Sequence, residues 1–368
     1  MEYICLNEVC SIKTGKLDAN ASTIDGKYPF FTCSKEILKI DNYSYDCECV
    51  LVAGNGDLNV KYYNGKFDAY QRTYIIEVKN KEEYNTLFIY YLIQSKIEDL
   101  KKQSIGAVIK YIKLNHLTSI KVPKIDIQEQ IKIVEILNNY KKLMTIKEKQ
   151  KSDIDCLINS KFIELFGNPI KNERNWNKYL LSELGTLKNG MNYSKESQNY
   201  KIKFLGVSEF KYGDIINDSS YLQDLYLTEK PEQISLLKNN DILFVRSNGS
   251  KDLVGRSLIF VDIEEDVTFS GFCIRFRNES KLINPRFLIK LFQNEEFKKS
   301  LKKDSRGANI NNINQQMLSN LPIIVPPLEL QNNFVDLVMN LEQIKIIIDK
   351  NSNELDTLYI KKVSEYFN

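Results

Sequence analysis

Several features common to enzymes and secreted proteins are scarce or missing in this sequence of 368 residues. No apolar run reaches the roughly 18 residues that a transmembrane helix needs, which excludes such a helix and predicts no membrane partner. The first ten residues contain neither a basic nor an apolar segment, so we expect no secretory signal. The seven cysteines are odd in number and scattered, which predicts reduced thiols in the cytoplasm.

The single histidine limits the catalytic chemistry that the chain can support. His116 lies close to Leu114 and Leu117, and these apolar neighbours indicate a structural role. Cys47 and Cys49 are not spaced as a C-x-x-C pair, which disfavours a zinc site. The sequence also lacks the glycine-rich loops that cradle phosphates. We therefore expect no catalytic residue, no metal site and no cofactor bound by this chain.

One enzymatic pattern remains as an alternative. Asp68 precedes Glu77 and Lys79, and some metal-dependent nucleases hold a divalent cation with two carboxylates beside such a lysine. The signal is weak because E-x-K triplets are common in a lysine-rich chain. The matching strand of the second half, residues 274–277, carries no acidic residue.

The composition predicts a folded chain with more than one core. Apolar residues make up 43% and charged residues 27%, which excludes disorder as the main state. The length suggests two or three domains. A net charge of +3 permits a nucleic-acid partner but does not argue for one, because autonomous DNA binders are usually more basic.

The most informative feature of the sequence is an internal repeat. The pattern that runs from Leu6 to Gly15 returns between Leu181 and Gly190. Three further matches follow in the same order: Ile105-Gly106-Ala107 to Ile112 with Arg306-Gly307-Ala308 to Ile313, Val122-Pro123 to Gln128 with Val325-Pro326 to Gln331, and Lys161 to Asn168 with Lys362 to Asn368. Because their order is kept, we interpret the chain as a tandem duplication with pseudo-two-fold symmetry.

The first part of each repeat has a mixed pattern. Short β-branched and aromatic runs alternate with turn residues, which predicts strands at 49–53, 74–78, 241–245 and 272–276. One helix is expected in each repeat, at about 82–102 and 285–303.

The second part of each repeat predicts a helix of about 40 residues. Apolar residues from Leu330 to Leu358 alternate steps of four and three, which is a heptad seam, and 127–165 carries a weaker version. The domain between the helices must return the chain to its start, so we expect 126–166 and 329–367 to pack antiparallel. The alternative is two amphipathic helices, each packed on its own domain. The side chains expected to be buried between the helices are Ile131, Val134, Leu157, Phe334, Leu337 and Leu358.

The expected fold class is therefore α+β, with two mixed α/β domains in tandem and two long helices that form an antiparallel coiled coil. The predicted boundaries are 1–122 and 169–325 for the domains, and 123–168 and 326–368 for the helices.

This organisation resembles the specificity (S) subunit of type I restriction-modification systems over essentially the whole chain. The resemblance rests on the Gly-Ala segments at Gly106 and Gly307, on the Pro-rich start of each long helix, and on Leu-Phe-Gly-Asn-Pro at 165–169. The sequence departs from the family pattern at Lys124, Ile127 and Leu330. The resemblance implies a structural role for these positions, so the departures put no functional role in doubt.

The resemblance implies a non-catalytic reader of double-stranded DNA. Two target-recognition domains would each read one half of a split target, and the helices would set the spacing. Two methyltransferase (M) subunits would bind S-adenosylmethionine and dock on the helices, and endonuclease (R) subunits would join for cleavage. A coiled-coil scaffold without a DNA role is the remaining alternative.

Base reading needs side chains with paired donors or acceptors, whereas phosphate contacts need only cations, hydroxyls or amides. Candidate DNA contacts lie in the predicted loops of both domains, and a solvated surface charge is at least as good an interpretation for any single one. They are Lys13, Lys16, Asn55, Lys61, Gln71, Arg72, Lys188, Asn192, Arg246, Asn248, Lys251 and Arg256.

Overall fold

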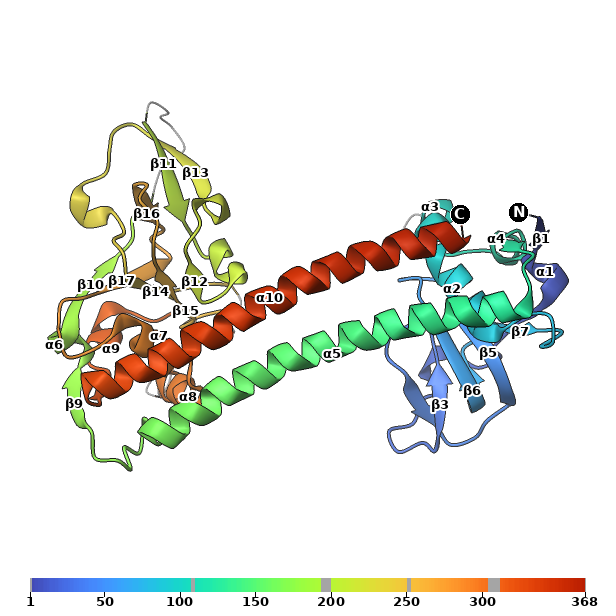
Figure 1. Ribbon diagram of the computed structural model, residues 1–368, viewed down its shortest axis with the longest axis horizontal. Helices are drawn as coiled ribbons and strands as arrows, with labels where there is room; N and C mark the ends of the chain where they lie inside the picture. Colours follow the sequence, from blue (N-terminus) through green and yellow to red (C-terminus); the bar gives the residue numbers. More distant parts are fainter. Residues whose placement is uncertain (1, 107–109, 193–199, 250–252, 304–311, 368) are drawn as a thin grey trace. The chain divides into compact units, whose positions relative to one another are not determined.

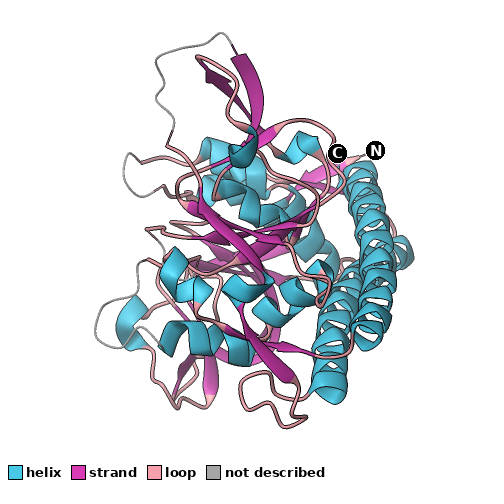
Figure 2. Cartoon of the chain, turned by 90° about the vertical axis from the view of Figure 1, so that its left-hand side faces the viewer, coloured by secondary structure: helices cyan, strands magenta, loops and turns pink. Residues whose placement is uncertain are grey.

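The computed structural model describes residues 2–106, 110–192, 200–249, 253–303 and 312–367, and most of the second Gly-Ala motif, 306–311, lies outside this part (Figure 1). The chain divides into two compact units, which comprise residues 1–150 with 348–368 (unit 1) and residues 151–347 (unit 2). Sheets and helices occur in both units, so the expected α+β class is confirmed. Figure 2 distinguishes the helices from the strands by colour. No helix within the described ranges is both long and apolar enough to cross a membrane.

Unit 1 contains a six-stranded sheet with the strand order β2-β7-β5-β6-β3-β4, and a separate antiparallel pair, β1 with β8. The side chains of β5 alternate, so Val50 and Val52 face one core while Cys49 and Leu51 face another. The elements are β1 (Tyr3–Cys5), α1 (Leu6–Val9), β2 (Cys10–Thr14), β3 (Tyr28–Phe31), β4 (Leu38–Ile40), β5 (Tyr45–Ala53), β6 (Val60–Ala69), β7 (Thr73–Val78), α2 (Thr86–Ser95), α3 (Ile97–Gln103), α4 (Leu114–Thr118), β8 (Lys121–Pro123) and the first part of α5 (Ile127–Phe166).

Unit 2 contains a five-stranded sheet with the order β10-β17-β14-β15-β12, a three-stranded sheet β13-β11-β16, and the antiparallel pair β18 with β9. Ile242 and Phe244 of β14 face a core shared with α7 and the long helices, and Leu243 and Val245 face the opposite core. The elements are β9 (Asn177–Leu180), α6 (Leu181–Leu184), β10 (Gly185–Asn189), β11 (Tyr200–Leu205), β12 (Ile215–Ile216), β13 (Gln223–Leu227), β14 (Asp241–Val245), β15 (Ser257–Phe260), β16 (Val267–Phe269), β17 (Cys273–Asn278), α7 (Pro285–Gln293), α8 (Glu295–Lys303), α9 (Gln315–Ser319), β18 (Pro322–Val325) and the first part of α10 (Leu328–Phe367).

The helices expected at 82–102 and 285–303 are each broken into two. In unit 2 the break falls at Asn294, whose side-chain oxygen accepts hydrogen bonds from the backbone N–H groups of Glu296 (3.0 Å) and Phe297 (3.3 Å). A side chain that caps a new helix N-terminus ends the preceding helix, which the apolar periodicity alone does not reveal.

Both long helices, α5 and α10, have 40 residues. Within unit 1 the first part of α5 contacts the last part of α10, where the rings of Tyr140 and Tyr359 lie 6.2 Å apart. Within unit 2 the last part of α5 contacts the first part of α10, where the rings of Phe162 and Phe334 lie 5.7 Å apart.

The burial expected along the long helices is correct at some positions and wrong at others. Val134 and Phe334 are buried, and Ile131 and Leu337 are partly buried. Leu157 and Leu358, by contrast, are 41% and 48% exposed. In these parts of the helices the inward-facing residues recur every four positions, so each of these leucines lies one residue away from the packed face. The packed residues are Ile154, Ile158, Phe162 and Phe166 on α5, and Tyr359, Val363 and Phe367 on α10.

A buried glutamine joins each long helix to the domain that precedes it. Oε1 of Gln130 accepts a hydrogen bond from the backbone N–H of Asn85 (3.0 Å), and its Nε2 donates to the carbonyls of Glu83 and Ile125 (2.8 and 3.0 Å). Gln331 makes the same bonds in unit 2, accepting from the N–H of Asn284 (2.8 Å) and donating to two carbonyls, those of Leu282 and Pro326 (3.0 and 2.7 Å).

These bonds relate different residues from those that the sequence match pairs at the start of the helix. The sequence match paired Gln128 with Gln331, but Gln128 is exposed and the residue with the equivalent bonds is Gln130. The two prolines that guided the match do not occupy equivalent positions, because Pro123 ends strand β8 whereas Pro326 follows strand β18.

We expect Gln331→Ala to lower the free energy of unfolding by about 2–4 kcal/mol, because it leaves one backbone N–H and two carbonyls without their buried partner. Denaturant unfolding followed by circular dichroism measures the loss. Asn333→Ala, at an exposed position on the same turn of α10, is the control and should change little. Equal stabilities of the two variants would contradict the structural role of Gln331.

Further along each long helix, a second polar contact joins the helix to its domain. In unit 1 the ammonium group of Lys141 donates to the Tyr90 hydroxyl (2.9 Å) and to Oε1 of Gln94 (3.0 Å), and lies 4.4 Å from the ring centre of Tyr91. Burial lowers the pKa of Lys141 to about 8. In unit 2 the ammonium group of Lys290 pairs with Glu342 (2.6 Å) and Asp214 (3.3 Å). Burial acts to lower the pKa of Lys290, but the two carboxylates outweigh it and raise the pKa.

The pKa of Lys141 predicts a specific pH dependence of stability. Between about pH 8 and its ordinary value of 10.5, the unfolded chain holds a proton at Lys141 that the folded chain has released, so this group adds stability as the pH rises. We expect the stability of the native chain relative to Lys141→Met, measured as the difference between their unfolding midpoints, to increase between about pH 7 and pH 9.5. The window stops below pH 10 because the unfolded tyrosines titrate there. A difference that does not change with pH would contradict the low pKa.

Candidate nucleic-acid interface

In unit 1 three chain segments meet where strand β5 ends. The backbone N–H of Gly54 donates to the carbonyl of Arg72 (2.8 Å), and the N–H of Ile112 donates to the carbonyl of Gly54 (2.9 Å). A Cβ atom at Gly54 would lie 2.4 Å from the Arg72 carbonyl oxygen, so only glycine allows this approach. Arg72 belongs to the tight turn between β6 and β7, and its position is therefore fixed by backbone contacts.

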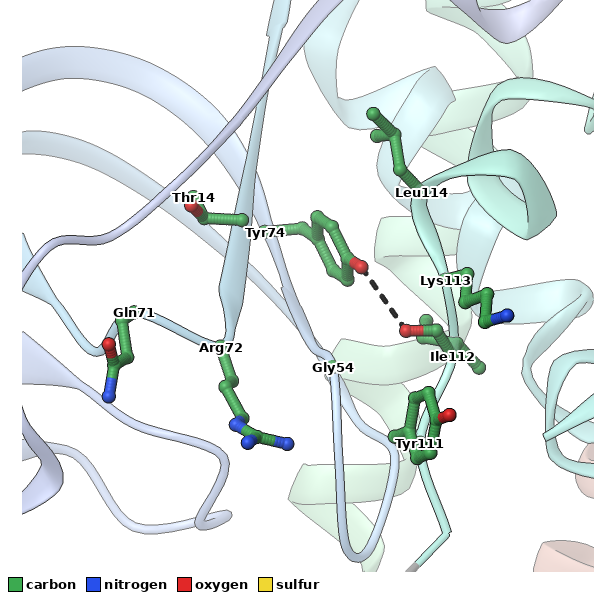
Figure 3. Close-up of a pocket in the computed structure, with 9 residues that line it drawn as sticks. All are labelled: Thr14, Gly54, Gln71, Arg72, Tyr74, Tyr111, Ile112, Lys113 and Leu114. Carbon is green, nitrogen blue, oxygen red and sulfur yellow. Dashed lines mark hydrogen bonds between the residues drawn. The ribbon is translucent and has the colours of Figure 1, made fainter. Parts of the chain in front are cut away.

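An open cleft of about 290 Å³ lies at this corner (Figure 3). It is lined by Thr14, Gly54, Gln71, Arg72, Tyr74, Tyr111, Ile112, Lys113 and Leu114. The hydroxyl of Tyr74 donates to the carbonyl of Ile112 (3.1 Å), and burial raises the pKa of Tyr74, which keeps this donor protonated. The guanidinium of Arg72 is exposed and has no partner among the residues that the structure describes. Such a group can bind a base edge or a phosphate.

Unit 2 builds the same backbone corner with different side chains. The N–H of Arg246 donates to the carbonyl of Phe272 (2.8 Å), and the N–H of Ile313 donates to the carbonyl of Arg246 (2.8 Å). Arg246 thus takes the place that Gly54 has in unit 1, and Phe272, which is 57% exposed, takes the place of Arg72. Each corner carries one arginine, but the two arginines come from different chain segments.

The other candidates of unit 1 differ in how free their side chains are. Lys16 is exposed, and Asn55 is half-buried in a bridge with the backbone of Tyr111. Gln71 donates to Oδ1 of Asp18 (2.9 Å). The ammonium groups of Lys13 and Lys61 are bonded to other groups of the same domain.

Lys61 donates to the carbonyl of Ser34 (2.7 Å) and to the side chain of Asn59, and burial lowers its pKa. Lys13 pairs with Glu77 (2.5 Å). Burial opposes the charge of Lys13, but the bond to Glu77 outweighs it and raises the pKa of Lys13.

The candidates of unit 2 also differ. Lys188 is half-buried on β10, opposite Arg275 of β17, and approaches the hydroxyl of Ser235 (3.4 Å). Arg256 and Asn192 are exposed and Asn248 is half-buried. Lys251 lies outside the described residues.

The candidates from the sequence do not include Tyr111, Lys113 or Phe272, which lie at these corners. Tyr111 belongs to segment 105–112, which the sequence match and the family resemblance single out, and this signal could have pointed to it. The sequence pattern places Phe272 in a strand at 272–276, whereas β17 begins one residue later, at Cys273, and leaves the phenyl ring exposed.

The structure does not assemble the alternative nuclease site. Asp68 lies on β6 and Glu77 on β7, and β5 separates these strands. Asp68 accepts hydrogen bonds from the hydroxyl of Ser44 (2.5 Å) and the N–H of Ala69 (2.8 Å), while Glu77 pairs with Lys13. The ammonium group of Lys79 donates to two backbone carbonyls. Within the described ranges, no group of three His, Cys, Asp or Glu side chains could hold a metal ion.

Comparison with known proteins identifies the family. The family model of the type I restriction modification DNA specificity domain matches residues 1–155 and 173–356. The chain belongs to the type I restriction-modification specificity (S) subunit family. The EcoDI specificity subunit of Escherichia coli is 42% identical over 134 residues, which cover 36% of this chain and 29% of that protein. The MjaVIII specificity subunit of Methanocaldococcus jannaschii is 25% identical over 361 residues, which cover 90% of this chain and 83% of that protein.

Solved structures support the fold of this S-subunit chain. The type I S subunit from M. genitalium aligns over 100% of this chain and 96% of its own, with a TM-score of 0.61 and 16% sequence identity. A second solved structure, which concerns complex assembly and conformational transition of the type I restriction-modification system, aligns with this chain with the same TM-score of 0.61 and 16% sequence identity.

The contrast between Lys16 and Lys61 predicts different effects on duplex binding by this S-subunit chain. Lys16→Met should reduce the slope of log affinity against log salt by about 1 without changing stability, because it removes one exposed cation. Lys61→Met should lower the unfolding temperature and leave the slope unchanged, because its ammonium group is bonded within the domain. Titration of a random-sequence duplex at several salt concentrations measures both slopes. A reduced slope for Lys61→Met would show that this lysine contacts DNA.

Proposed function

We propose that this chain is the non-catalytic DNA-reading subunit of a type I restriction-modification complex, and that each domain reads one half of a bipartite target in double-stranded DNA. The observation that carries this proposal is the pair of corners with the same backbone hydrogen bonds and different side chains. Arg72 and Arg246 leave these corners at different places. An arginine that pairs with a guanine edge would therefore meet a different base step in each domain, which favours two unlike half-sites.

The recognition domains in this proposal are residues 1–122 and 169–325, and the helices at 123–168 and 326–368 form an antiparallel coiled coil that fixes the gap between half-sites. Support comes from the contacts within each unit, where the beginning of one long helix packs against the end of the other. The buried glutamines add support, because they hold each domain in a fixed register on its helix.

The long helices also offer a surface for the M subunits. Apolar side chains stay exposed on them although a neighbouring face is packed, and such residues favour a protein partner. They are Ile136, Leu143, Ile146, Leu358 and Ile360 in unit 1, and Leu157, Ile163, Leu328, Met339, Ile344, Ile346 and Ile347 in unit 2. Two M subunits would supply S-adenosylmethionine and the methyl transfer, and R subunits would add cleavage.

Mapping of methylated bases in host DNA, with and without this gene, tests the proposal. We expect a bipartite, non-palindromic motif that disappears with the gene. A continuous palindromic motif would contradict the two-reader arrangement, and an unchanged methylation pattern would favour the scaffold alternative.

Single arginine variants separate the two half-sites, and each variant controls for the other. Arg246→Ala should relax specificity in one half by about 1–3 kcal/mol, and Arg72→Ala should relax only the other half. Methylation of a target library by the reconstituted complex measures both effects. A uniform loss over all sequences would make the residue a phosphate contact, and relaxation of both halves by one variant would contradict the assignment of one domain to one half.

A further inference from the structure

We propose that a partly buried polar pair ties each recognition domain to the first part of the long helix that follows it, and that the second domain can take the place of the first domain on the first part of α5 only if Lys141 is replaced by an acidic residue. The pairs are Tyr91 with Lys141 in unit 1 and Lys290 with Glu342 in unit 2. The inference concerns packing, so it holds or fails independently of DNA reading.

The two pairs occupy equivalent positions in their units. Asn85 and Asn284 cap α2 and α7, and each donates its backbone N–H to the buried glutamine of the long helix. Tyr91 lies six residues after Asn85, and Lys290 six residues after Asn284. On the long helices, Lys141 and Glu342 each lie eleven residues, about three turns, after the glutamine.

In unit 1 the helix supplies the cation and the domain supplies neutral partners. The ammonium group of Lys141 lies 4.5 and 4.4 Å from the ring centres of Tyr90 and Tyr91 and donates to Tyr90 and Gln94. The Tyr91 hydroxyl is oriented by a hydrogen bond to Oδ1 of Asn138 (2.6 Å). Aromatic faces and amide oxygens stabilise a cation without a carboxylate.

In unit 2 the domain supplies the cation and the helix supplies the anion. The side chain of Lys290 is 12% exposed, and its ammonium group lies between Glu342 of α10 and Asp214, which precedes β12. A lysine buried this deeply needs a carboxylate, because an unpaired buried charge is strongly destabilising.

The two pairs are therefore not interchangeable, and one exchange of domain and helix is less favourable than the other. On the first part of α5, the second domain would keep Asp214 but lose Glu342, and Lys290 would lie against Lys141, so that two ammonium groups share one partly buried site. The first domain on α10 would bring Tyr91 against Glu342, where a phenol hydroxyl can donate to a carboxylate. The geometry thus makes the first part of α5 selective and the first part of α10 permissive.

Charge reversals in the full chain test the pairs without moving a domain. Glu342→Lys should lower the unfolding temperature by roughly 6–12 °C, because it places a second ammonium group against that of Lys290. Adding Lys290→Tyr should recover at least half of this loss, because it recreates the lysine–tyrosine pair of unit 1. Lys141→Glu should have a much smaller effect than Glu342→Lys, and Asp336→Lys, at an exposed position of α10, is the control for the charge change. Equal effects of Glu342→Lys and Asp336→Lys, or no recovery in the double variant, would overturn the proposal.

A chimaera tests the selectivity directly. A copy of residues 177–325 replaces residues 2–124 in front of α5, once with Lys141 and once with Lys141→Glu. We expect only the chimaera with the glutamate to be soluble and to unfold cooperatively by calorimetry. Equal folding of both chimaeras would overturn the proposal. Failure of both chimaeras would also overturn it, because the expected rescue by the glutamate would be missing.

Discussion

Most of the structure depends on one constraint: a domain of strands must be held in a fixed register on a helix that is much longer than the domain. The buried side chains of Gln130 and Gln331 meet this constraint by bonding to the backbone on both sides of the junction. A buried amide is stable only when its donors and acceptors are paired, so a slip of one residue along the helix would break several bonds at once. Apolar packing alone would tolerate such a slip more readily.

Because the register is fixed, the two domains can have similar backbones at their corners and different side chains on their surfaces. The backbone of each corner is held by hydrogen bonds that do not depend on side chains, apart from the close approach at Gly54. The side chains at the rim can therefore change without cost to the fold, as they do between Arg72 and Phe272. The pairs at Lys141 and Lys290 are the opposite case, because they are partly buried and each partner limits the other.

The long helices and the alternation of strands were predictable because both follow from a regular period in the sequence. The helices at Ile127–Phe166 and Leu328–Phe367 agree with the expected ranges to within one residue at each end. The buried face was less predictable. A heptad assumes one partner helix, whereas Phe162 packs on Phe287 of α7 as well as on Phe334 of α10. Because α5 packs on α7 as well as on α10, its packed face is rotated about the helix axis, and Leu157 lies outside this face.

The sequence by itself determined the α+β class, the two long helices and the family, because periodicity and motif order are properties of the chain read in one dimension. It also supplied a set of candidate cations. Only the tertiary structure decided which of these are free, since Lys13 and Lys61 are bonded to groups far away in the sequence while Arg72 is not. The pairing of Gln130 rather than Gln128 with Gln331 was decided there too. A hydrogen bond depends on the direction and distance between two groups, and neither is recorded in the spacing of residues along the chain.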